Sequence, residues 1–124
     1  MTITKTTINS QVLSKIIAKG MQEKKAIDIV IMDLRHISQA VADYFVVCSG
    51  NTTNQVDAIT DSVEEVVYKD TDELPYRKEG KENKEWILLD YIDVVVHIFR
   101  KDRREFYALE DLWGDAKFTN ISSE

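Results

Sequence analysis

Apolar residues recur every three or four positions in three stretches of this sequence, which is the spacing of amphipathic helices. The stretches are residues 10–20, 51–70 and 101–113. Asn9 or Ser10 can cap the first helix and Asn51 or Thr52 the second, because their side chains accept hydrogen bonds from free backbone amides. Gly114 can end the third. We therefore expect three helices along the chain.

The segments between these helices have the pattern of strands. Residues 26–34 alternate and are rich in β-branched side chains, and residues 43–50 are apolar enough for a strand buried on both faces. Residues 85–90 and 92–99 are separated only by Tyr91. That link is too short for a helical crossover, so these two strands should form an antiparallel hairpin.

A short edge strand is also expected around residues 76–78. The order of elements predicts a single α/β domain, with a mixed sheet of about five strands and flanking helices. We assign residues 9–118 to this domain, residues 1–8 to a flexible N-terminus and residues 119–124 to a C-terminal tail.

Alternation in the hairpin assigns its side chains to two faces. One set of the second strand is wholly apolar and should pack on helices: Ile92, Val94, Val96 and Ile98. The other set is mixed, so its face should be half covered: Asp93, Val95, His97 and Phe99. If Trp86, Leu88 and Asp90 share this face, it carries an aromatic anchor, aliphatic area and an acidic rim, as protein-binding patches do. The alternative is that a helix or a second subunit covers it.

Charge and cysteine content narrow the choice of partner. The chain has 124 residues and a net charge of −6, and residues 57–93 alone carry 12 acidic and five basic side chains. This favours a basic protein surface over nucleic acid, although acidity can simply keep a domain soluble. Cys48 is the only cysteine, which suggests a reducing, cytoplasmic setting. No apolar run reaches the roughly 20 residues of a membrane helix.

Catalytic and metal chemistry find little support in the sequence. The spacing of His36, Cys48 and His97 matches no metal motif, and Cys48 lies in an apolar strand. The basic cluster at residues 101–105 is short and contains acids, so we expect a solvated helix start rather than an RNA contact.

A phosphate site is conceivable where the strand at residues 43–50 runs into the second helix. Nucleotidyltransferases place a Gly-Ser pair there, followed by an Asp-x-Asp metal site. Here the pair is reversed, as Ser49-Gly50, and no Asp-x-Asp follows on a nearby strand. We favour a turn residue followed by a helix cap.

Three segments of the chain resemble the ribosomal silencing factor family, also called RsfS or Iojap. They are "ADYFVVCSGNTTNQVDAITDSVEE", "EGKENKEWILLDYIDVVVHIF" and "REFYALEDLWGDAKF", and the similarity extends from about Ser10 to Phe118. The resemblance implies a nucleotidyltransferase-like fold without the catalytic acids, and no enzymatic activity, cofactor or metal.

The resemblance also implies a partner. Family members bind ribosomal protein fourteen of the large (50S) subunit, block joining of the 30S subunit and repress translation under nutrient limitation. Homodimers are expected in the free state, and an assembly role for the large subunit is an alternative. The contact residues implied for this chain are Trp86, Leu88, Asp90, Tyr91, Asp93, His97, Glu105 and Trp113.

Overall fold

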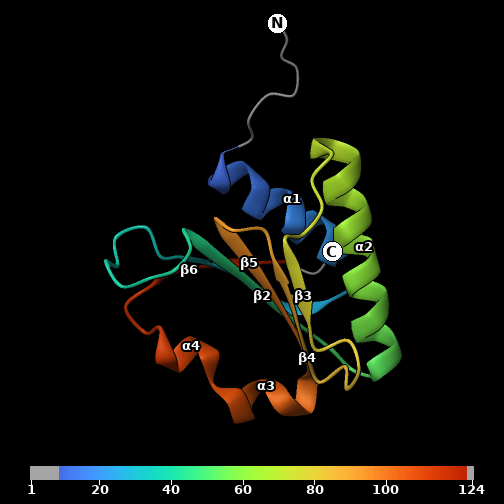
Figure 1. Ribbon diagram of the computed structural model, residues 1–124. Helices are drawn as coiled ribbons and strands as arrows, with labels where there is room; N and C mark the ends of the chain where they lie inside the picture. Colours follow the sequence, from blue (N-terminus) through green and yellow to red (C-terminus); the bar gives the residue numbers. More distant parts are fainter. Residues whose placement is uncertain (1–8, 123–124) are drawn as a thin grey trace, which may run out of the picture.

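The computed structural model describes residues 9–122, which form a three-layer arrangement of helices on both sides of one sheet (Figure 1). The helices are α1 (Ser10–Glu23), α2 (Thr53–Thr71), α3 (Lys101–Tyr107) and α4 (Leu109–Leu112). The strands are β1 (Ile27–Asp33), β2 (Tyr44–Gly50), β3 (Arg77–Glu79), β4 (Trp86–Asp90), β5 (Val94–Arg100) and β6 (Lys117–Ile121). The predicted flexible N-terminus, residues 1–8, lies outside the described residues.

The six strands form a mixed sheet in the order β3-β4-β5-β2-β1-β6. Only the central pair β2 and β5 is parallel, and every other neighbouring pair is antiparallel. The chain crosses from β2 to β5 through α2 and the two-stranded β3–β4 unit. The hairpin and the α/β architecture are therefore confirmed, and the sheet is one strand wider than the sequence predicted.

Helices α1 and α2 cover one face of the sheet and enclose the larger hydrophobic core (Figure 1). The predicted caps are present, since Asn9 accepts from the amide of Val12 and Thr52 from that of Gln55. The two helices approach closely at Gly20, where an added Cβ would lie 2.9 Å from the Cα of Val63. Helix α1 does not end at this glycine but continues to Glu23.

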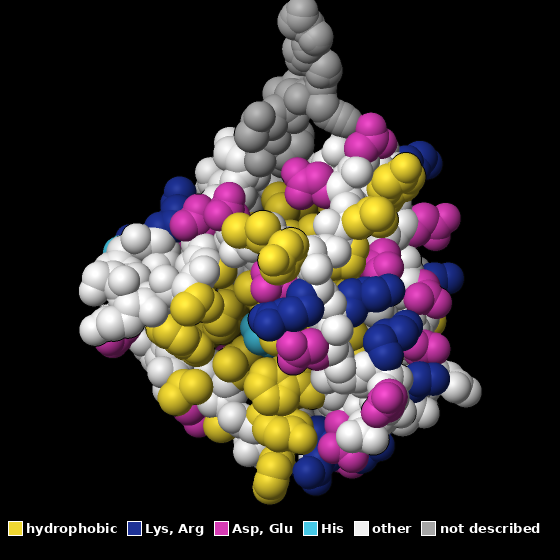
Figure 2. Space-filling model, in the orientation of Figure 1, with side chains coloured by type: hydrophobic (Ala, Val, Ile, Leu, Met, Phe, Trp, Pro, Cys, Tyr) yellow, Lys and Arg dark blue, Asp and Glu magenta, His cyan; other side chains and the backbone are white. Residues whose placement is uncertain are grey.

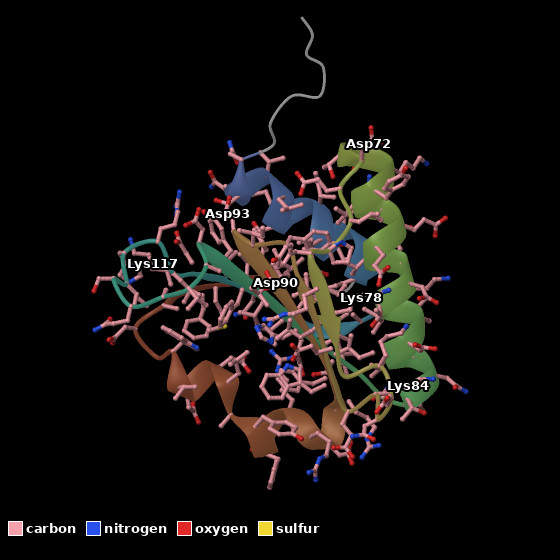
Figure 3. The ribbon with its side chains drawn as sticks, in the orientation of Figure 1. Asp72, Lys78, Lys84, Asp90, Asp93 and Lys117 are labelled. Carbon is pink, nitrogen blue, oxygen red and sulfur yellow. The ribbon has the colours of Figure 1, made fainter. Side chains whose placement is uncertain are left out.

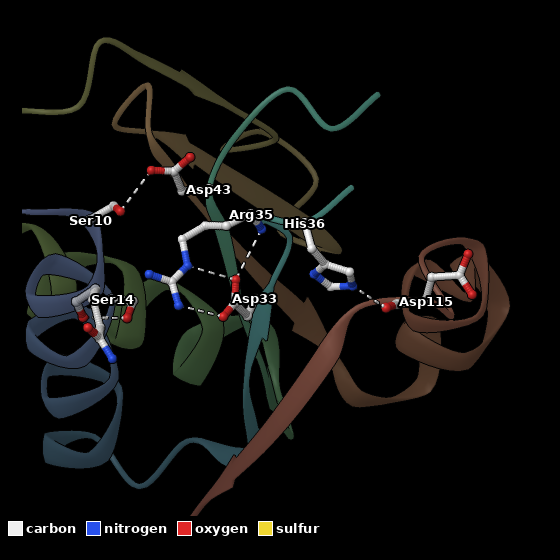
Figure 4. A network of polar contacts seen from close by, with 8 residues as sticks. Ser10, Ser14, Asp33, Arg35, His36, Asp43 and Asp115 are labelled. Carbon is white, nitrogen blue, oxygen red and sulfur yellow. Dashed lines mark hydrogen bonds and ion pairs between the residues drawn. The ribbon is translucent and has the colours of Figure 1, made fainter. Parts of the chain in front are cut away.

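Helices α3 and α4 lie on the opposite face with the connector of residues 34–43, over a second and smaller core (Figure 1). Polar contacts fix the connector at both ends (Figure 4): Arg35 donates two side-chain hydrogen bonds to Asp33, and Ser10 Oγ donates to Asp43 at 2.8 Å. His36 contacts the backbone oxygen of Asp115 through Nε2 at 2.9 Å. These contacts hold the connector in place against this face of the sheet.

The end of the chain differs from the prediction. The single helix expected over residues 101–113 is broken at Ala108, which adopts left-handed φ of 49° and separates α3 from α4. The chain then forms β6, which pairs antiparallel with β1 and includes residues 119–121 of the predicted tail. The prediction missed this strand because "KFTNI" is short and largely exposed.

Arg104 explains how α3 and α4 are held against the sheet. Its guanidinium donates to both carboxylate oxygens of Glu110, to the backbone oxygen of Asp28 at 2.7 Å and to Ser49 Oγ at 3.0 Å. Only 12% of the side chain is exposed. The expectation of a wholly solvated basic cluster is therefore wrong for this arginine.

Candidate protein-binding site

The strand register brings Trp86 and His97 onto one face of the sheet. In the β4–β5 ladder Trp86 lies opposite Phe99, Leu88 opposite His97 and Asp90 opposite Val95. Directly opposed residues in an antiparallel pair point to the same side. The pairing that the sequence left open is thus the one that gathers Trp86, Leu88 and Asp90 with His97.

His97 is hydrogen-bonded to Trp86 and buried. The indole Nε1–H donates to His97 Nδ1 at 3.0 Å, so a neutral imidazole carries its proton on Nε2. Only 3% of His97 is exposed, and burial lowers its pKa to about 3. The Nε2 atom has no hydrogen-bond partner within residues 9–122. The pairing that places His97 on the face of Trp86 is therefore present, but the histidine forms the floor of this face and is not displayed on the surface.

Aromatic rings surround this pair and make the floor rigid. Phe45 packs edge-on against His97 with centroids 4.6 Å apart, and Trp113 packs edge-on against Phe45 at 5.8 Å. On the other side of the cluster, Trp86 lies 5.0 Å from the ring of Phe99 and 4.7 Å from that of Tyr107. We call these six side chains the aromatic floor: Phe45, Trp86, His97, Phe99, Tyr107 and Trp113.

The face above the floor is open. Trp86 and Leu88 are half-buried, and no helix of residues 9–122 crosses β4 on this side (Figure 1). Figure 2 shows hydrophobic side chains gathered over this part of the sheet and over α3 and α4. Phe106 and Leu112 at its margin are 68% and 76% exposed. Exposed apolar area of this kind, with a rigid aromatic base, is typical of a protein-binding surface.

The two acids of the predicted rim have different environments. Asp90 accepts from the amide of Ile92 at 2.7 Å and lies 3.5 Å from a guanidinium nitrogen of Arg77. Asp93 lies in the turn just before β5 and is exposed, and the structure shows no side-chain contact for it within residues 9–122. Figure 3 shows the separation between the two positions. Asp90 therefore stabilises the hairpin, whereas Asp93 has a carboxylate available for a partner.

Two residues expected near the face lie elsewhere. Tyr91 is buried in the core beneath α1 and α2, where burial together with the charges of Glu64 and Glu73 raises its pKa. Glu105 is exposed on α3 beside Arg104 and lines a shallow hollow with Ala108 and Glu110 that is separate from the aromatic floor.

Ile92 also differs from the prediction. It lies in the turn and not on the strand, and it is 59% exposed where the alternation placed it inside. The sequence reading also missed Tyr107 and Arg77. Tyr107 packs against Trp86 with the two ring planes tilted by 48°, and Arg77 lies opposite Asp90 in the β3–β4 ladder. Alternation in β3 could have placed Arg77 on this face, but no signal marked Tyr107.

Within residues 9–122, the side chains considered for metal binding are not brought together, and the start of α2 is occupied by the chain's own hydrogen bonds. Cys48 and His97 lie on opposite faces of the sheet, since the β2–β5 register pairs His97 with Val47. Within residues 9–122 no cluster of three or more potential ligands could hold a metal ion. At the start of α2, Gln55 accepts from the amide of Asn51 and donates to the carbonyls of Lys24 and Lys25. The chain's own side chains thus bond the amides of Asn51 and Gln55, two of the donors that a phosphate at this helix start would use.

Comparison with known proteins identifies the family. Residues 7–124 match the family model described as "Ribosomal silencing factor during starvation". The ribosomal silencing factor RsfS of Bacillus subtilis is 41% identical over 115 residues, covering 92% of this chain and 95% of that protein. A crystal structure of a Chromobacterium violaceum protein superposes with a TM-score of 0.81 at 29% identity, covering 93% of this chain and 94% of that one.

A more distant relative is the mouse protein named "Mitochondrial assembly of ribosomal large subunit protein 1". It is 34% identical over 89 residues, covering 66% of this chain and 39% of the mouse protein. The fold is a single α/β domain with an open mixed sheet and a half-open aromatic face. The chain belongs to the ribosomal silencing factor RsfS family, a family of ribosome-associated regulators. In the part of the chain that is described, no helix has the length and apolarity to cross a membrane.

Proposed function

We propose that this protein binds the large ribosomal subunit in the cytoplasm, through ribosomal protein fourteen of that subunit. By occupying the surface where the 30S subunit docks, it prevents subunit joining and represses translation when nutrients are limited. The mechanism is steric exclusion and involves no catalysis. The observation that carries this proposal is the open face over the aromatic floor.

The chemistry of this face supports a protein partner. The half-buried Trp86 and Leu88 offer apolar area on a base whose rings fix one another, so little side-chain entropy is lost on binding. The exposed carboxylate of Asp93 stands at its rim. The excess of acids across residues 57–93 would attract a basic protein surface and speed its association.

The proposal is tested by co-sedimentation of the purified protein with isolated 50S subunits and with 70S ribosomes. We expect binding to 50S subunits and little binding to 70S ribosomes, and inhibition of subunit joining measured by light scattering. A pull-down with purified ribosomal protein fourteen tests the direct contact. Binding to neither particle, or equal binding to both, would contradict the proposal.

A matched pair of variants locates the surface. Leu88→Gln places a polar group on the open face and should weaken 50S binding at least about tenfold, the effect of losing roughly 1.4 kcal/mol. Tyr68→Gln also introduces a glutamine, but at a residue of α2 that is 51% exposed and lies on the other side of the sheet. Binding of this variant should be unchanged. Sedimentation equilibrium of the free protein would show whether a second copy covers the face instead.

An assembly role is the alternative function, and the name of the mouse mitochondrial relative favours it. The same surface would then act on precursors of the large subunit. Depletion of the protein followed by gradient analysis separates the two. Accumulation of incomplete large subunits in growing cells indicates assembly, whereas normal subunits with faster joining in starved cells indicate silencing.

A further inference from the structure

The turn between β4 and β5 holds an isoleucine in a strained conformation. Ile92 has φ of 77°, in the left-handed region. The amide of Asp93 donates to the carbonyl of Tyr91 at 3.0 Å, the amide of Tyr91 to the carbonyl of Val94 at 2.9 Å, and the amide of Ile92 to the carboxylate of Asp90 at 2.7 Å. These three hydrogen bonds fix the backbone in spite of the strain.

A β-branched side chain is among the least suitable for this position. Glycine adopts positive φ without steric cost, and asparagine tolerates it, whereas a β-branched residue there is an outlier. Ile92 gives the fold little in return, because 59% of it is exposed and it belongs to neither hydrophobic core. Strain retained without a structural benefit is characteristic of functional positions.

Two further apolar side chains lie on segments that are joined to this turn by backbone hydrogen bonds. The amide of Tyr76 donates to the carbonyl of Asp90 at 2.7 Å, and the amide of Asp43, two residues after Val41, donates to the carbonyl of Asp93 at 2.8 Å. Tyr76 is 77% exposed and Val41 is 80% exposed. We call Ile92, Tyr76 and Val41 the apolar tip, because these hydrogen bonds join their segments at one end of the sheet. The exposed Asp93, labelled in Figure 3, belongs to the same turn as Ile92.

We propose that Ile92 is a specificity-determining anchor, which the strained turn presents for insertion into an apolar recess of the basic ribosomal protein bound by the open face. This inference rests on the proposed function, and it extends the contact surface from the aromatic floor to the apolar tip. The partner recess is apolar at its centre and basic at its edge, to match Ile92 and Asp93. The turn holds the anchor in its bound conformation before the partner arrives, so binding need not order it.

The proposal predicts that one substitution raises the stability of the protein and lowers its affinity for the partner. Ile92→Gly removes both the strain and the anchor. The melting temperature should rise by about 2–4 °C, while the affinity for purified 50S subunits should fall by about tenfold or more. Ile92→Val keeps a strained apolar side chain and should retain most of the affinity.

Lys25→Gly is the matched control. Lys25 has φ of 58° and is exposed in the turn after α1, so the variant places glycine at another positive-φ position away from the tip. It should also raise the melting temperature but leave 50S affinity unchanged. If wild-type protein does not bind 50S subunits, the proposed function fails. If wild type binds and Ile92→Gly binds equally well, or if that variant melts lower, the anchor is refuted while the proposed function stands.

Discussion

The indole of Trp86 donates its hydrogen bond to His97 Nδ1 across the β4–β5 ladder at 3.0 Å, which joins a half-buried ring to a buried one. The bond thus links neighbouring strands within the aromatic floor. It also fixes the protonation state of the imidazole, because Nδ1 can accept only while it carries no proton.

The burial of His97 predicts a dependence of stability on pH. His97 is neutral in the folded protein until the pH approaches about 3, whereas an unfolded histidine takes up a proton near 6.5. Unfolding below pH 6.5 therefore binds a proton, and stability should fall as the pH falls, by up to about 1.4 kcal/mol per pH unit from this group. Urea unfolding between pH 7 and about pH 5 would measure the slope.

The control for this slope is His97→Gln, whose amide oxygen can still accept from Trp86 but does not titrate. Carboxylates and His36 are the same in both proteins, so their contributions cancel in the comparison. The variant should lose less stability than the wild type over the same pH interval. Parallel slopes would mean that His97 becomes protonated without unfolding.

A double-mutant cycle should show that the two residues are coupled. Trp86→Phe removes the donor and leaves His97 Nδ1 buried without a partner, which should cost about 1–3 kcal/mol in the free energy of unfolding. In Trp86→Phe/His97→Phe both polar groups are gone, so the double variant should lose less than the sum of the single variants. Additive losses in urea denaturation would contradict the coupling.

Substitution of Asp90 should mainly lower stability, whereas substitution of Asp93 should mainly weaken binding. Asp90→Ala removes the acceptor for the amide of Ile92 and the ion pair with Arg77, and should cost about 1 kcal/mol in the free energy of unfolding. Asp93→Ala should change stability by less than about 0.5 kcal/mol. For binding we expect the reverse order, with Asp93→Lys weakening the affinity for 50S subunits by roughly 1 kcal/mol or more.

Measurement of both quantities on the same preparations tests this assignment. Asp90→Asn keeps an oxygen acceptor for Ile92 and serves as the conservative variant, which should recover most of the lost stability. An Asp93→Lys protein that folds normally and binds with wild-type affinity would remove Asp93 from the contact surface.

Gly80 should be essential for the position of Trp86. It has φ of 89°, and an added Cβ would collide with the carbonyl oxygen of Trp86. Gly80→Ala must therefore shift β4 or open the turn, and should cost at least about 1–2 kcal/mol. Gly114→Ala is the matched control, because its Cβ would meet only the backbone oxygen of Asp111, at 3.5 Å. Equal melting temperatures for the two variants would contradict this account.

Sequence patterns predicted those parts of the fold that depend on interactions between residues close together in the chain. The caps at Asn9 and Thr52 and the hairpin follow from side-chain chemistry and alternation within a few residues. The burial of His97 could not be predicted in this way, because its cover comes from Phe45 on β2 and from Trp86 on β4. Alternation gives the face of a residue, but not what other elements place upon it.

The errors arise where tertiary contacts override local preference. Ile92 has the apolar character of a strand residue, yet the hydrogen bonds of the turn place it outside. The break at Ala108 carries no glycine or proline signal, and it accompanies the pairing of Arg104 with Glu110 across the two short helices. Strand β6 depends on its pairing with β1, some 90 residues earlier in the chain.

The contacts of Arg104 have a consequence for the timing of synthesis. Asp28 and Ser49, whose oxygens accept hydrogen bonds from Arg104, are synthesised long before Arg104 itself. Tyr107 and Trp113 are synthesised after it. A ribosome adds roughly 5–20 residues per second. A chain still being made therefore has the β4–β5 hairpin without the rings that complete its floor. The floor of the open face can therefore be completed only when translation of the chain is nearly finished.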